Sequence, residues 1–175
     1  HYPLRRQRQM CIRDSLENVD DWIDNQIKKS LHRLRIPALY GVLLHRSESL
    51  QGKTGEQVVK SLERHKSSGL VKKIGVSIYD PSELEFANQV MPLDLVQVPL
   101  NLLDRRLESS GWLVRLHSLG VEIHSRSTFL QGLLVMPRNQ IPTKFERWSH
   151  LWDNWHRQLK ELKTTAMAAC LSYPM

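Results

Sequence analysis

The residues best suited to chemistry in this sequence lie where apolar runs end. ALYGVLL is followed by His45, VKKIGVS ends on Ser77, LDLVQVPL contains Gln97 near its end, and VEIHS leads into residues 125–127. A histidine in such a position can donate a hydrogen bond to an oxygen on which negative charge develops. A single polar strand end is more often a hydrogen-bonded terminus than a functional group. Four in succession indicate one shared site.

The elements that must position these residues alternate along the chain from residue 18 onward. Apolar residues recur at three- and four-residue steps, which predicts helices over 19–34, 54–69, 80–90, 112–120 and 143–162. Nearly continuous apolar runs predict four strands, over 38–44, 71–77, 93–100 and 121–125. Capping-box spacings start at Thr54, Asp80 and Thr143. This alternation favours an α/β protein with a parallel sheet, whose carboxyl ends gather the site residues.

The bulk composition is typical of one soluble globular domain, with 175 residues, 41% of them hydrophobic and 25% charged. No apolar run reaches the roughly eighteen residues of a membrane span, and the arginine-rich start lacks the apolar segment of a secretory signal. Beyond residue 15, Cys170 is the only cysteine, and the histidines lack metal-ligand spacing. We therefore expect a cytoplasmic protein with neither disulfides nor a bound metal.

The net charge of +7 is concentrated at the start of the chain. Residues 1–15 hold four arginines and one aspartate, so three of the seven net positive charges fall in this leader. Its last segment, MCIRDS, back-translates as the transposon end used to prepare sequencing libraries. We interpret residues 1–15 as an adapter artefact, with a genuine basic or disordered leader as the alternative, and exclude them from the fold argument.

Four segments, in order, resemble the aldo-keto reductase family over residues 18–172. SLHRLRIPALYGVLLHR resembles the helix and strand that deliver the family's active-site histidine, and GLVKKIGVSIYDPSEL resembles the next strand with its G-x-S turn. LDLVQVPLNLLDRRLE is similar to the glutamine-bearing strand, and GVEIHSRSTFLQGLL to the final strand and cofactor loop. The resemblance implies that residues 16–175 form a partial (β/α)8 TIM barrel, with about four parallel strands and flanking helices.

The resemblance also implies an oxidoreductase that binds a nicotinamide cofactor across the carboxyl end of the barrel. The cofactor is usually NADPH, and NADH remains open. His45 matches the histidine that orients the substrate carbonyl. Ser77 and Gln97 match residues that hydrogen-bond the nicotinamide carboxamide. The remaining matches lie in the loop that contacts the cofactor's phosphates: Ser127, Gln131 and Gly132.

Two residues depart from the family pattern. Ile78 stands where the family commonly has asparagine, which removes one contact to the carboxamide. Arg126 stands in the position of the aromatic residue that stacks on the nicotinamide. A guanidinium plane can also stack on a ring, but it adds positive charge beside a cofactor that becomes cationic on oxidation. Arg126 either favours the reduced cofactor or weakens turnover, and the sequence leaves both open.

The family's reaction moves a hydride from the nicotinamide to a carbonyl carbon while a tyrosine, tuned by a lysine and an aspartate, donates a proton. These three residues belong to early strands that do not precede residue 18 here. Because a typical barrel needs about 250 residues, we expect a fragment truncated at both ends and inactive alone. The expected partner is a small aldehyde or ketone. We expect no binding to nucleic acid or to a membrane.

Two other functions remain open. Trp148, Trp152 and Trp155 are interleaved with basic residues and could form a nucleic-acid surface. Their spacing of four and three residues is that of one apolar stripe, which favours packing. Ile78 and Arg126 also permit a barrel that binds the cofactor without catalysis.

Overall fold

The computed structural model describes the backbone of residues 7–10 and all of residues 18–174. It contains one sheet whose strands follow chain order: β1 (Gln7–Met10), β2 (Leu39–Leu44), β3 (Val71–Ser77), β4 (Leu95–Pro99) and β5 (Glu122–Arg126). Strands β1 to β4 pair in parallel. The α/β class and the four strands predicted from the sequence are confirmed.

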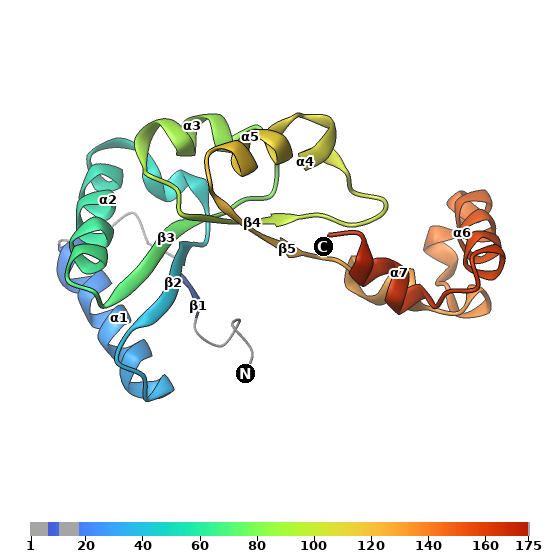
Figure 1. The fold of residues 1–175 in the computed structure, drawn as a ribbon, viewed down its shortest axis with the longest axis horizontal. Helices are drawn as coiled ribbons and strands as arrows, with labels where there is room; N and C mark the ends of the chain where they lie inside the picture. Colours follow the sequence, from blue (N-terminus) through green and yellow to red (C-terminus); the bar gives the residue numbers. More distant parts are fainter. Residues whose placement is uncertain (1–6, 11–17, 175) are drawn as a thin grey trace. The chain divides into compact units, whose positions relative to one another are not determined.

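Helices connect the strands, and Figure 1 shows α1, α2, α3 and α5 along one side of the sheet. The α-helices of the described residues are α1 (Val19–Leu34), α2 (Gly52–Ser67), α3 (Glu83–Val90), α4 (Arg106–Ser109), α5 (Trp112–Ser118), α6 (Ser149–Glu161) and α7 (Ala166–Ser172). Short 3-10 helices add η2 (Ser47–Leu50), η3 (Leu130–Val135), η4 (Arg138–Gln140) and η5 (Thr143–Trp148). No helix in this part of the chain is long and apolar enough to cross a membrane.

Strand β1 lies inside the leader that the sequence argument set aside. It pairs with β2 from Gln7 opposite Gly41 to Met10 opposite Leu44. The rest of the leader, residues 1–6 and 11–15, lies outside the described residues. The adapter interpretation concerns the origin of these residues and stays a prediction.

Helix starts differ from all three predicted capping boxes. The box at Thr54 is wrong, because α2 starts before it, at Gly52, without a side-chain cap. The box at Thr143 is also wrong, because a 3-10 helix forms there and α6 begins only after it. At the third, α3 begins only at Glu83, with Ser82 at the N-cap and no side-chain cap, although the Asp80 amide does donate to Glu83 Oε1 at 2.8 Å.

The described residues form two compact units, and the first comprises residues 7–10, 18–98 and 106–124. Its core lies between the helices and the sheet, where the largest apolar side chains are fully buried: Ile23 and Ile27 of α1, Leu62 of α2, and Ile74 of β3. Burial of each such side chain contributes about 1.5–3 kcal/mol before entropy is counted. This packing holds β2 and β3 against the two longest helices.

Gly75 of β3 allows the neighbouring strand to come close. It lies opposite Leu95 of β4, and a Cβ at Gly75 would be 1.7 Å from the Leu95 carbonyl oxygen. Only a residue without a side chain fits this approach. The same register places Ser77, two residues further on, opposite Gln97.

The second unit comprises residues 99–105 and 125–175, and its core holds the tryptophans of the predicted stripe. Trp152 is 2% exposed, and its Nε1 donates to the Phe145 carbonyl at 3.1 Å. Trp155 Nε1 donates to the Leu134 carbonyl at 2.9 Å. Packing of these two rings is confirmed. Trp148 is half-buried, like Trp155, and lies beside Phe145, with ring centroids 6.1 Å apart.

Candidate functional site

His45 and Ser77 lie at the carboxyl ends of β2 and β3, and Gln97 lies level with Ser77 within the neighbouring β4. Ser77 of β3 is opposite Gln97 of β4. His45 directly follows Leu44, the last residue of β2, which is opposite Val76 of β3. The three side chains therefore come from the same end of the sheet, at nearly the same level. Their predicted roles in catalysis and cofactor binding stay predictions.

The side chains of Ser77 and Gln97 are in contact. Ser77 Oγ donates to Gln97 Oε1 at 3.3 Å, and Ser77 is 2% exposed, whereas Gln97 is half-buried. A hydroxyl and an amide both donate and accept hydrogen bonds. The pair can therefore bind a ligand group that itself carries a donor and an acceptor, such as a carboxamide.

Ile78 belongs to the opposite face of the strand from Ser77, because successive side chains in a strand alternate. It is fully buried, and its backbone amide donates to the Gln97 carbonyl at 2.9 Å. That bond continues the pairing of β3 with β4 past Ser77. Ile78 therefore serves the core and helps to align the pair beside it.

The loop predicted to bind the cofactor belongs to the second unit. Arg126 is the last residue of β5, and the loop residues Ser127, Gln131 and Gly132 follow it. The loop has an unusual backbone, with φ of +59° at Ser127, +54° at Gln131 and +92° at Gly132. Leu130 is also left-handed, with φ of +46°. A left-handed conformation costs a residue other than glycine about 1–2 kcal/mol. The loop therefore needs outside contacts to hold it.

Asn101 supplies one such contact. It is 1% exposed, and its Nδ2 donates to the Ser127 carbonyl at 3.0 Å. Its Oδ1 accepts from the amides of Leu103 at 2.9 Å and Asp104 at 2.8 Å. The sequence placed Asn101 close behind Gln97 but assigned it no role. An asparagine just after a strand end was the available signal.

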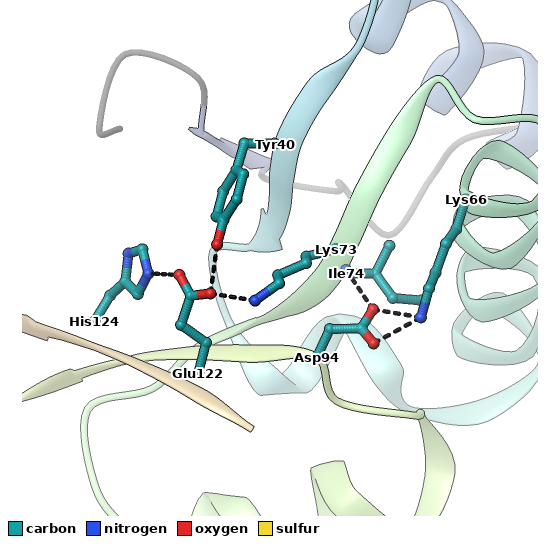
Figure 2. A network of polar contacts seen from close by, with 7 residues as sticks. All are labelled: Tyr40, Lys66, Lys73, Ile74, Asp94, Glu122 and His124. Carbon is teal, nitrogen blue, oxygen red and sulfur yellow. Dashed lines mark hydrogen bonds and ion pairs between the residues drawn. The ribbon is translucent and has the colours of Figure 1, made fainter. Parts of the chain in front are cut away.

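A polar network around Glu122, which was not predicted from the sequence, lies at the other end of the strands (Figure 2). Tyr40 of β2 donates from its hydroxyl to Glu122 Oε2 at 2.5 Å, Lys73 of β3 pairs with the same oxygen, and His124 contacts Oε1. Lys73 and Glu122, charged residues inside otherwise apolar strands, were the signals that could have found this network.

The network strongly favours the ionised form of Glu122. Burial raises the pKa of its carboxyl, but the hydrogen bonds from Lys73, Tyr40 and His124 outweigh burial and lower the pKa to about 2. The bond to Glu122 in turn raises the pKa of Lys73. These groups come from β2, β3 and β5, so their attraction ties separated strands together.

A second ion pair lies nearby, also in Figure 2. Asp94, just before β4, accepts two hydrogen bonds from Lys66 Nζ at 2.6 Å and one from the Ile74 amide at 2.9 Å. Both clusters lie toward the amino-terminal ends of the strands, where polar residues in barrels of parallel strands serve stability rather than catalysis. Among the described residues, no group of three or more histidines, cysteines or carboxylates could hold a metal ion.

Comparisons with known proteins agree with this architecture. A model of the Aldo/keto reductase family matches residues 14–175. The structure of glycerol dehydrogenase AKR11B4 from Gluconobacter oxydans is 20% identical, with a TM-score of 0.68 over 89% of this chain and 52% of its own. The holo form of aldo-keto reductase AKR11C1 from Bacillus halodurans is 20% identical, with a TM-score of 0.61 over 78% of this chain and 46% of its own.

A third structure is an aldo/keto reductase from Klebsiella pneumoniae in complex with NADP and acetate. It is 16% identical, with a TM-score of 0.61 over 91% of this chain and 52% of its own. No curated protein matches the sequence. The chain thus spans about half the length of these solved structures. The predicted partial TIM barrel is confirmed.

Proposed function

This chain belongs to the aldo/keto reductase family, and we propose that it is part of an NAD(P)H-dependent reductase acting on aldehydes or ketones. The observation that carries the proposal is the contact between Ser77, at the carboxyl end of β3, and Gln97, opposite it in β4. In parallel α/β folds, this end of the sheet is where ligands bind. Since the chain spans half of the structures it resembles, the activity belongs to a larger protein.

Ser77 and Gln97 are the residues that would hold the nicotinamide carboxamide. That group has one carbonyl acceptor and one amide donor, which a hydroxyl and a side-chain amide can both satisfy. The donor set therefore fits the cofactor. When bound, the reduced nicotinamide supplies the hydride. Burial of Ser77 keeps its hydroxyl in one place, which orients the carboxamide and excludes water from it.

His45 is the residue that would face the reacting carbonyl. It follows β2 directly and is half-buried, so it lies beside the pair rather than within the core. Its imidazole donates a hydrogen bond to the carbonyl oxygen, where negative charge grows during reduction. This contact orients a small aldehyde or ketone and stabilises the transition state.

Ser127, Gln131 and Gly132 are the proposed contacts to the cofactor's phosphates, and the guanidinium plane of Arg126 can lie against a ring. NADPH is the proposed cofactor, with NADH as the alternative. The Klebsiella pneumoniae structure is a complex with NADP, which favours NADPH. The basic side chain of Arg126 also suits an anionic dinucleotide.

The proton donor of the reaction would come from outside this chain. We propose that the isolated chain binds cofactor but does not reduce carbonyl compounds, because none of its residues has been matched to the family's tyrosine, lysine and aspartate. A barrel that binds the cofactor without catalysis is the second candidate, which Ile78 and Arg126 favour. A longer reading frame at this locus that carries no tyrosine–lysine pair would favour that second candidate.

Titration with NADPH, followed by its fluorescence, tests the proposal. We expect Ser77→Ala and Gln97→Leu each to weaken binding about tenfold, the effect of one lost hydrogen bond. Ser47→Ala is the matched control in the same unit, since Ser47 is also buried and its hydroxyl bonds Glu83 at 2.5 Å instead. Absence of binding, or equal binding by all variants, would reject the proposal.

A further inference from the structure

The link between Asn101 and Ser127 joins the segment after β4 to the loop after β5. Both residues belong to the second unit, so the link lies within one compact body. The neighbouring backbone bond, from the Leu100 amide to the Arg126 carbonyl at 3.2 Å, runs between the same two segments. Asn101 therefore continues the strand pairing by one step, with its side chain in place of the backbone.

The orientation of the Asn101 amide follows from its partners. Two backbone amides, of Leu103 and Asp104, can only donate, so the atom facing them is the oxygen. The Ser127 carbonyl can only accept, so the atom facing it is the nitrogen. The backbone N–H of Asn101 donates to the Asp104 carbonyl at 3.2 Å. Asn101 thus closes its own turn and reaches across to the loop.

The strained residues of the 127–132 loop lie next to the hydrogen bond from Asn101. Ser127 is left-handed, and its carbonyl accepts from Asn101 and also from the Leu130 amide at 2.8 Å. The next left-handed residues, Leu130 and Gln131, follow within one turn. Without the Asn101 bond, the Ser127 peptide can rotate toward a less strained conformation. The positions of the backbone amides beyond it would change as well.

We infer that Asn101 is a positioning residue, which holds the 127–132 loop in the one conformation that receives the cofactor's phosphates. The inference rests on the proposed cofactor function of Ser127, Gln131 and Gly132. Asn101 itself is buried and need not touch the cofactor. Its contribution is to fix the loop before binding, so that the ligand does not have to order it.

Two substitutions separate the link to Ser127 from the turn. Asn101→Ser leaves a hydroxyl that can still accept from the Asp104 amide, as serine does in such turns, but is too short to reach Ser127. Asn101→Asp keeps the shape and the acceptor of the turn and loses the donor. Serine is neutral, so an effect shared by both variants isn't charge repulsion. Asp153→Asn is the control, since it breaks the ion pair with Arg138 in the same unit.

Hydrogen exchange of the 127–132 amides and NADPH affinity are the two readouts. We expect exchange in the loop to quicken at least several-fold in both Asn101 variants, and NADPH affinity to fall about tenfold. Asp153→Asn should keep wild-type values in both. The inference would be overturned if Asn101→Ser bound NADPH as tightly as the wild type and its 127–132 amides exchanged at the wild-type rate.

The readouts also separate this inference from the proposed function. If the wild-type chain does not bind NADPH, the cofactor proposal fails, and exchange alone tests the loop. Faster exchange confined to residues 127–132 then supports Asn101 as the residue that positions the loop. Unchanged exchange overturns it. If the wild type binds and the Asn101 variants bind equally well, the cofactor proposal stands and the role of Asn101 does not.

Discussion

Replacement of Glu122 by glutamine should remove much of the acid sensitivity of this fold. In the folded chain the pKa of Glu122 is about 2, against an ordinary 4.5. As pH falls below 4.5, the unfolded carboxylate takes up a proton and the folded one does not. The stabilisation by Glu122 is therefore complete above pH 4.5 and is lost between pH 4.5 and 2.

The size of this effect follows from the pKa difference. Each pKa unit corresponds to about 1.4 kcal/mol, so the lowering of this pKa from 4.5 to about 2 sets an upper limit of roughly 3.5 kcal/mol for Glu122. The Glu122 side chain is 27% exposed and that of Lys73 is 32% exposed, so solvent screens part of the attraction. We therefore expect the ionised Glu122 to contribute about 1–2 kcal/mol to the free energy of unfolding at pH 7.

Urea unfolding followed by far-UV circular dichroism, from pH 7 down to pH 3, measures this difference. Glu122→Gln should be about 1–2 kcal/mol less stable than wild type at pH 7, and the gap should narrow as pH falls. Glu85→Gln is the control, because Glu85 pairs with Arg115 on the surface, where such pairs contribute little. A gap that stays constant from pH 7 to pH 3 would refute the argument.

Two further predictions concern a buried histidine and two glycines of the sheet. Burial, and then the charge of Arg64, lowers the pKa of His65 in the folded chain. As pH falls below about 6.5, His65 is therefore protonated first in the unfolded chain, and the stability of the fold should decrease from there toward pH 5. Thermal melts of His65→Gln should not show this decrease in melting temperature with pH. Gly75→Ala should cost about 3 kcal/mol, since its Cβ would meet the backbone of β4, whereas Gly41→Ala meets only the tip of the Leu95 side chain and should cost about 1 kcal/mol. Urea midpoints of both variants test the comparison, and equal losses would contradict it.

The sequence by itself determined the features that depend on local pattern. The strand over 71–77 was predicted to the residue from its mainly apolar sequence, although Lys72 and Lys73 interrupt the run. The helix over 19–34 was likewise predicted from one apolar face. His45 and Ser77 could be assigned to strand ends because one follows and the other closes a mainly apolar run, whereas Gln97 lies inside β4.

Only the tertiary structure decided which distant residues meet. Glu122 contacts Tyr40 and Lys73 across 82 and 49 residues of sequence, and Asn101 reaches Ser127 across 26. Helix starts such as that of α6 also depended on packing, since a 3-10 turn replaced the predicted first turn. The physical reason is that burial periodicity repeats within a few residues and is visible locally. The partner of a charge or an amide is set by strand register, which exists only once the sheet has formed.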